Sequence, residues 1–411
     1  MSRDKFIVAG LTLAVVLAVW GLGNVRGGAQ AWKSQPVYGG PALAPVNVGE
    51  FRGFSLELHG GDPNHPFDTY IDEIAQTGAN SICMVIPGLQ ENAGSTYIAI
   101  DARKVPSDAR LKELIAFAHK KKLRVLLMPI VLLEKPRTGE WRGVINPGDG
   151  TKWPDWWQNY EDYIVHYAKI AQETNTEVFM VGSELISTEE KEKEWRRVIR
   201  AARGVYRGLL SYSANWDHYK AVKYWDDLDM VGMTTYYDLT GKDKPTLERL
   251  AQGWEPIKKE ILDWRAKTVP TKPLLFTEVG WPNQITCAEF PWDYYRSPDK
   301  PDMEAQANCF EAFFRTWIDD KNVAGMLVWE WRNYPGQKIG PDDTSYVPCG
   351  KTAMDVIRKY FQAKSAWDKS AQAPGATLPA PVALPPEKPD TNPQPATSAP
   401  EAPSGDEMND D

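Results

Sequence analysis

Short apolar runs alternate with longer amphipathic stretches between residues 51 and 363. Short apolar and β-branched runs are typical of buried strands, and apolar residues at helical spacing are typical of helices. The predicted strands cover residues 51–58, 80–86, 124–131, 177–184, 208–214, 229–235, 273–279 and 324–329. The predicted helices cover residues 67–77, 108–121, 156–173, 189–206, 216–225, 247–267, 303–319 and 352–361. This strict alternation predicts an α/β fold in which a parallel sheet closes into a (β/α)8 TIM barrel.

An open, doubly wound sheet is the alternative that the same alternation allows. Such sheets usually have fewer strands, and a glycine-rich phosphate loop often follows their first strand, whereas no such loop follows residues 51–58. We therefore expect the barrel. In a TIM barrel the chemistry takes place at the C-terminal ends of the strands, so eight strand ends hold the candidate residues.

The two ends of the chain differ from the region between them. Arg3 and Lys5 precede an almost uncharged run at residues 6–22, so we expect residues 1–27 to be a signal peptide or a membrane anchor. In either case the positive charges favour a cytoplasmic N-terminus and an extracytoplasmic domain, secreted or anchored by this single segment. Residues 28–50 are typical of a linker. Residues 364–411 form a tail rich in proline, alanine and acids, which we expect to be disordered.

The charge balance argues against a nucleic-acid partner. The chain has 47 Lys and Arg against 55 Asp and Glu, a net charge of −8, and most of the excess lies in the acidic tail. A nucleic-acid-binding protein needs a basic face to neutralise phosphates. The 17 Trp residues instead favour a carbohydrate ligand, because indole rings stack on the apolar faces of sugars, although an aromatic-rich core also explains any one of them. We expect a monomer.

Two glutamates stand at the ends of predicted strands. Glu184 ends the fourth strand and Glu278 lies near the end of the seventh. Burial of an unpaired carboxylate costs several kcal/mol, so an acid in such a place needs a reason. Strands three apart face each other across the mouth of an eight-stranded barrel, and two facing carboxyls are the arrangement that cleaves a glycosidic bond.

Each glutamate also has a structural explanation. Glu184 could help to start the next helix, and Glu278 could pair with Arg52 or another base. The two acids together, with aromatic neighbours, favour the catalytic interpretation.

Three motifs carry a resemblance to a known family. They are Val181-Gly182-Ser183-Glu184, the run from Phe276 through Thr277-Glu278-Val279-Gly280 to Trp281, and Val328-Trp329-Glu330-Trp331. With these motifs, residues 51–363 resemble clan A retaining glycoside hydrolases, and most of all the family 113 β-mannanase-type barrels.

The resemblance assigns roles to individual residues. It implies that Glu184 is the acid/base and Glu278 the nucleophile, and that Tyr236 or its neighbour Tyr237 touches and orients the nucleophile. It also implies that Trp329 forms the floor of the subsite for the attacked sugar. One position departs from the clan pattern, because Ser183 stands where most members have the asparagine that binds the sugar 2-hydroxyl.

Further substrate contacts are expected from other strand ends. Asparagine, arginine and tryptophan side chains there can hydrogen bond or stack on sugars. The candidates are Trp141 and Arg142, Asn215 and Trp216, Trp281 and Trp331, Arg52 and Ser183, with Glu57 and His59 at the end of the first strand.

The expected activity is hydrolysis of a β-linked polysaccharide or oligosaccharide, with β-mannan as one candidate, by double displacement. This predicts retained configuration and carboxyls about 5–5.5 Å apart. It also predicts a raised pKa for Glu184 and a low pKa for Glu278, the latter through a donor such as Arg52 or Tyr236. The alternative is a carbohydrate-binding barrel without catalysis.

The sequence gives little indication of a metal site or a cofactor site. The five histidines are scattered and no metal-binding motif is present, so we expect no metal and no cofactor. In an exported protein we expect a disulfide between Cys287 and Cys349, which lie in or near the loops after the seventh and eighth strands. Cys287 with Cys309 is the next pairing.

Overall fold

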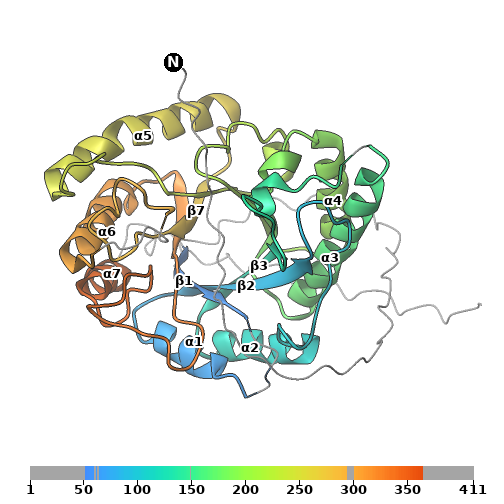
Figure 1. Cartoon of the computed structure of the whole chain (residues 1–411), viewed down its shortest axis with the longest axis horizontal. Helices are drawn as coiled ribbons and strands as arrows, with labels where there is room; N and C mark the ends of the chain where they lie inside the picture. Colours follow the sequence, from blue (N-terminus) through green and yellow to red (C-terminus); the bar gives the residue numbers. More distant parts are fainter. Residues whose placement is uncertain (1–50, 60–61, 63, 149, 294–299, 364–411) are drawn as a thin grey trace, which may run out of the picture. The chain divides into compact units, whose positions relative to one another are not determined.

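Eight parallel strands form a closed barrel in the order of the sequence, and helices encircle it (Figure 1). The computed structural model describes residues 51–59, 62, 64–148, 150–293 and 300–363, so the predicted signal segment, linker and tail lie outside the described residues. The strands are β1 (Phe51–Glu57), β2 (Ser81–Gln90), β3 (Arg124–Leu133), β4 (Val178–Ser183), β5 (Leu209–Ala214), β6 (Val231–Thr234), β7 (Leu274–Val279) and β8 (Val323–Val328). β1 pairs with both β2 and β8, which closes the sheet and confirms the TIM barrel.

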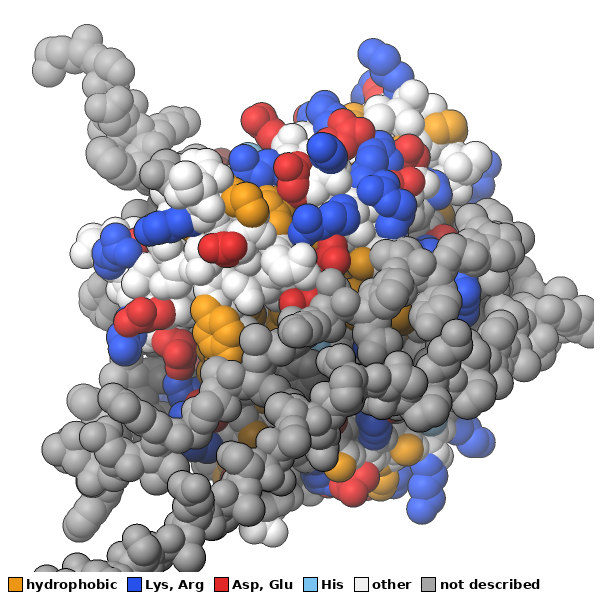
Figure 2. Space-filling view, turned by 90° about the vertical axis from the view of Figure 1, so that its right-hand side faces the viewer, with side chains coloured by type: hydrophobic (Ala, Val, Ile, Leu, Met, Phe, Trp, Pro, Cys, Tyr) orange, Lys and Arg blue, Asp and Glu red, His pale blue; other side chains and the backbone are white. Residues whose placement is uncertain are grey.

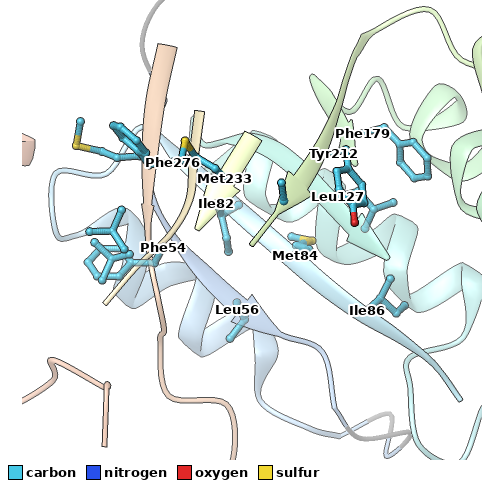
Figure 3. Close-up of a cluster of buried hydrophobic side chains, with 14 of the residues drawn as sticks. Phe54, Leu56, Ile82, Met84, Ile86, Leu127, Phe179, Tyr212, Met233 and Phe276 are labelled. Carbon is cyan, nitrogen blue, oxygen red and sulfur yellow. The ribbon is translucent and has the colours of Figure 1, made fainter. Parts of the chain in front are cut away.

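The side chains on the two faces of the barrel strands pack into two separate hydrophobic clusters. Phe54, Ile82 and Phe276 belong to an outer cluster that also contains helix residues (Figure 3). An inner cluster, with Val85 and Met128 among its members, takes strand and loop residues and none from the α-helices. The inner cluster is the filled interior of the barrel, because alternate side chains of a strand point to opposite faces.

Seven α-helices are present among the described residues. They are α1 (Phe67–Ala75), α2 (Asp108–Lys120), α3 (Trp153–Glu173), α4 (Glu192–Val205), α5 (Leu247–Thr268), α6 (Met303–Trp317) and α7 (Thr352–Gln362). Ser107, Thr246 and Asp302 begin α2, α5 and α6 as N-caps, because each side chain accepts a hydrogen bond from a backbone N–H in the first turn.

The predicted helix at residues 216–225 is wrong. The chain forms successive turns there, followed by a single 3-10 turn, η3 (Trp225–Asp227). The indole N–H of Trp225 donates to the backbone carbonyl of Tyr219, which a continuous helix would need for its own hydrogen bond. The loop after β5 is therefore irregular, and it carries Asn215, Trp216 and His218 close to the barrel mouth.

Arg52 supports the base of the barrel and does not lie at its mouth. It shares the parity of Phe54 along β1 and therefore points outward, where its Nη1 donates to the carbonyls of Ala363 at 2.7 Å and Tyr360 at 3.4 Å. A guanidinium at the C-terminal end of a helix stabilises the exposed carbonyls there. The prediction that Arg52 binds substrate or lies beside Glu278 is therefore wrong.

Replacing Arg52 by Met should lower the free energy of unfolding by about 1–3 kcal/mol, because partly buried carbonyls at the end of α7 lose a charged donor. Urea denaturation monitored by circular dichroism measures the change. Arg103→Met is the matched control, since Arg103 is exposed and pairs only locally with Asp101. Unchanged stability in the Arg52 variant would contradict this role.

Both signs of charge are mixed on the outer surface near α3 and α4, which lie on the right of Figure 1 (Figure 2). Arg196 of α4, for example, pairs with Glu192, Asp226 and Asp227. None of the helices in the described ranges is long and apolar enough to span a bilayer.

Candidate active site

Glu184 follows β4 in an unusual backbone conformation. Its φ of 51° lies in the left-handed region, which costs a residue with a side chain about 1 kcal/mol or more. The turn is held from both sides, because the backbone N–H of Glu184 donates to Ser213 at 2.8 Å and the N–H of Leu185 donates to the Tyr212 hydroxyl at 2.9 Å. Glu184 is only 8% exposed, and Nη2 of Arg142 donates to its Oε2 at 2.6 Å.

Glu278 reaches the barrel interior because β7 is irregular. Strict alternation from Leu274 and Phe276, which belong to the outer cluster, would turn position 278 outward. The pairing register shifts between Phe276 and Val279, so that Val279 takes the outer position instead. Glu278 thereby contacts Tyr236 of the inner cluster, whose hydroxyl donates to its Oε2 at 2.8 Å.

The two carboxyls interact electrostatically. Burial, followed by the negative charge of Glu184, raises the pKa of Glu278 to about 8. Burial also raises the pKa of Glu184, although the guanidinium of Arg142 opposes this. The charge of Arg142 interacts with both carboxyls. Two acids that repel each other in a buried site retain a proton between them at neutral pH.

The expected low pKa of Glu278 is therefore wrong. The charged donor proposed for it, Arg52, lies elsewhere, and the only hydrogen bond to its carboxylate among the described residues comes from the neutral hydroxyl of Tyr236. Its Oε1 is buried without a hydrogen-bond partner in this part of the chain. A neutral donor lowers the pKa of a buried carboxyl less than a guanidinium does, so it offsets less of the rise that burial causes.

Three more of the predicted substrate residues are buried. Trp329 belongs to the inner cluster and is 7% exposed. Ser183 is buried beside Glu184, and its hydroxyl has no hydrogen-bond partner among the described residues. The indole of Trp141, before the 3-10 turn η1 (Arg142–Val144), packs against Gly143.

The loop after β5 contributes an aromatic platform. Trp216 is partly exposed and stacks on Trp292 from the loop after β7, with ring centroids 5.7 Å apart and an interplanar angle of 23°. Asn215 accepts from the backbone of Trp216 and from the hydroxyl of Thr234. Both indoles pack against the inner cluster. Trp292 was not predicted, because its position after β7 becomes informative only once the loop is folded.

Trp281 and Trp331 do not reach the substrate side, so these two predictions are wrong. Trp281 is fully buried in the outer cluster, edge-on to Phe310 of α6. Trp331 packs edge-on against Phe54 and lines a cavity of about 560 Å³ beside α1 and α7. Both lie on the outward-facing side of their strand ends, and outward side chains meet helices.

A second acidic pair lies at the ends of β1 and β8. The carboxyls of Glu57 and Glu330 interact electrostatically, and the side-chain amide of Asn333 donates to Oε2 of Glu57 at 3.0 Å. Burial, followed by the charge of Glu57, raises the pKa of Glu330 well above its ordinary value. Nδ1 of His59 lies 3.8 Å from Glu57. Glu330 was not predicted as a site residue, although it follows a strand end just as Glu184 does.

The predicted disulfide between Cys287 and Cys349 is absent. All four cysteines are described and all are free and buried. The Sγ of Cys287 contacts that of Cys309 at 3.8 Å, because the loop after β7 folds back onto α6. In the described part of the chain no cluster of histidine, cysteine and acidic side chains is arranged to hold a metal ion.

The fold agrees with what comparison with known proteins finds. The chain is similar to a family 113 β-mannanase from Alicyclobacillus acidocaldarius in complex with ManMIm, at 29% identity and a TM-score of 0.66, over 77% of this chain and 99% of that chain. It is similar to another family 113 β-1,4-mannanase at 28% identity and a TM-score of 0.65, over 77% of this chain and 100% of that chain. A β-glucuronidase from Ruminococcus gnavus shares the fold alone, at 14% identity and a TM-score of 0.52, over 76% of this chain and 50% of that chain.

No curated protein sequence matches the chain significantly. The model of Glycoside Hydrolase Family 113 matches residues 64–351. The chain therefore belongs to Glycoside Hydrolase Family 113 and is a retaining glycoside hydrolase.

Proposed function

We propose that the protein hydrolyses β-1,4-linked mannan, with Glu278 as the nucleophile and Glu184 as the acid/base. One observation carries the assignment. Two buried carboxyls, from the ends of β4 and β7, interact with each other, and each has a different donor. Tyr236 binds Oε2 of Glu278, and the other oxygen, Oε1, has no hydrogen-bond partner among the described residues and is available to attack. Arg142 holds the carboxyl of Glu184 in place.

The reaction proceeds in two displacements. The Glu278 carboxylate forms a bond to the anomeric carbon while the bond from that carbon to the leaving oxygen breaks, and Glu184 gives its proton to that oxygen. Glu184 then takes a proton from water, the hydroxyl bonds to the anomeric carbon, and the bond to Glu278 breaks. The second displacement reverses the inversion of the first, so the configuration is retained.

The charge around the site supports an uncharged substrate. Glu57 adds a further carboxyl whose charge acts on Glu278, whereas Arg142 is the nearby guanidinium and is already bonded to Glu184. A uronate would meet like charge and lose affinity. Neutral mannan agrees with this balance and with the β-1,4-mannanases to which the chain is similar.

The full chain should be incubated with mannan, β-glucan and galactan oligosaccharides and with polymers of uronic acid. We expect cleavage of the mannan oligosaccharides, with the β-anomer appearing first in the proton NMR spectrum. Cleavage of another polymer but not of mannan would show that mannan is not the substrate. Binding without any product would support a carbohydrate-binding barrel instead.

Replacing Arg142 by Gln should move the pH–rate profile to higher pH. The guanidinium lowers the pKa of both catalytic carboxyls, so its loss should raise both. The alkaline limb, where the pair loses its last proton, then moves upward, and kcat falls because Glu184 is less well held. The pH dependence of kcat/KM measures the shift. Arg137→Gln, an exposed position in the same loop, should leave the profile unchanged, and an unmoved profile in the Arg142 variant would contradict the assignment.

We further propose that the barrel acts outside the cytoplasm as a monomer, secreted or anchored by residues 1–27. The support is the sequence, where Arg3 and Lys5 precede the apolar run at residues 6–22. Cell fractionation with alkaline carbonate extraction distinguishes an anchored from a secreted chain, and light scattering gives the oligomeric state. A cytoplasmic location or a stable oligomer would refute the respective part of this proposal.

A further inference from the structure

Behind Glu184 lies a second acid that the reaction does not use. Glu189 follows the 3-10 turn η2 (Ile186–Thr188) and is completely buried. The Tyr212 hydroxyl donates to its Oε1 at 2.8 Å, and Nδ1 of His218 lies 3.4 Å from its Oε2. A buried carboxylate is costly, so its presence indicates a role in what surrounds it.

Tyr212 connects this acid to the catalytic turn. Its hydroxyl donates its proton to Glu189 and accepts the backbone N–H of Leu185, the residue directly after Glu184. Glu184 adopts the left-handed conformation, which persists only where its surroundings hold it. The Tyr212 hydroxyl is therefore one of the contacts that fix the direction of the Glu184 side chain.

The charge of Glu189 also acts on Glu184. After burial and Arg142, the negative charge of Glu189 is the next influence on the pKa of Glu184, and it raises that pKa. His218 is 38% exposed at its side chain, and the contact with Glu189 raises its own pKa. When His218 is protonated, its charge offsets that of Glu189; when it is neutral, the full negative charge acts on Glu184.

The other ionisable groups around Glu189 do not take over the roles of Glu189, Tyr212 and His218. Tyr224 also faces Glu189 but is fully buried, and burial raises its pKa well above the ordinary value, so it stays neutral. Asp217 and Glu190 act on His218 and favour its charged form. Asp217 additionally raises the pKa of Glu184.

We propose that Glu189, Tyr212 and His218 form a positioning network that holds the turn of the acid/base Glu184 and sets the charge beside it. None of the three touches substrate in this scheme. The inference rests on the proposed role of Glu184, and it adds that the partly exposed His218 adjusts this role to the surrounding pH.

Glu189→Gln keeps the shape of the network and removes its charge. The pKa of Glu184 should fall, and the alkaline limb of the kcat/KM profile should move to lower pH by about half a unit or more. Tyr212→Phe keeps the charge and removes the tether, so kcat should fall about 10-fold or more with little change in KM, because a small misplacement of a catalytic group is costly. Glu161→Gln and Tyr167→Phe are matched controls at buried positions away from the site.

His218→Gln should act on the opposite limb. Without the imidazolium, the charge of Glu189 is not offset at acidic pH, so the acid limb should move to higher pH. The double variant Glu189→Gln/His218→Gln should behave like Glu189→Gln alone, because His218 acts through Glu189. Additive effects of the two changes would overturn the network.

The fall in the pKa of Glu184 can also be measured without turnover. Carbon-13 NMR follows the titration of the Glu184 carboxyl in the Glu278→Gln variant, with and without Glu189→Gln. If Glu184→Ala is inactive but Glu189→Gln matches the wild type in both readouts, the network is wrong and the proposed function stands. If Glu184→Ala retains full activity, the proposed function itself fails.

Discussion

Replacing Glu278 by Ala should lower kcat by about 10⁴-fold or more, a loss of the size seen when a catalytic nucleophile is removed. The covalent intermediate cannot form, and the remaining carboxyl of Glu184 is held by Arg142 and accessible only as an acid or a base. Substrate affinity should survive, because Trp329, Trp216 and Trp292 remain in place. Steady-state kinetics on mannan oligosaccharides and isothermal titration calorimetry measure the two quantities separately.

The stereochemistry of rescue provides a second test of the nucleophile. Azide is small enough to enter the space left by the Glu278 side chain and should attack the anomeric carbon directly. A single displacement inverts the configuration, so the product should be the α-glycosyl azide. Glu255→Ala, at an exposed position of α5, is the control and should retain full activity. Substantial turnover by the Glu278 variant without azide would refute the assignment.

Replacing Glu184 by Ala should have an effect that depends on the leaving group. Cleavage of mannan oligosaccharides should fall by about 10²–10⁴-fold, because their leaving oxygen needs a proton in the transition state. Aryl glycosides with acidic phenols need little protonation, so their first step should persist. The second step still lacks its base, and a burst of phenol followed by slow turnover should report an accumulated glycosyl-enzyme.

Azide should rescue this variant with the opposite outcome. It attacks the glycosyl-enzyme, and two inversions give the β-glycosyl azide. Equal losses on mannan and on activated aryl glycosides would argue that Glu184 acts on binding or folding and is not the acid/base. Thermal melting of the variant separates a folding defect from both.

The identity of the two acids and the barrel around them follow from local pattern. The eight apolar runs predict the eight strands because buried parallel strands are nearly continuously hydrophobic, and each run is found as a strand. Glu184 and Glu278 stand out because a charged side chain at the end of such a run is costly to bury without a partner. The side-chain caps of α2, α5 and α6 likewise depend only on neighbouring residues.

The direction of each side chain was decided by the tertiary structure. A register shift turns Glu278 into the barrel, and a left-handed residue turns Glu184, whereas regular alternation sends Arg52 outward to α7. Trp281 and Trp331 were misplaced for the same reason. One residue of shift reverses the face of every later side chain, and nothing in the local pattern records such a shift.

The sequence by itself determined the class of fold, the strand ends and the pair of acids, because these depend on the order of apolar and polar residues. The tertiary structure alone decided the pKa of Glu278, the pairing of Glu57 with Glu330, the contact of Cys287 with Cys309 and the network behind Glu184. Each of these depends on burial and on contacts between segments far apart in the chain. Such distances are set when the barrel closes, and no spacing along the sequence contains them.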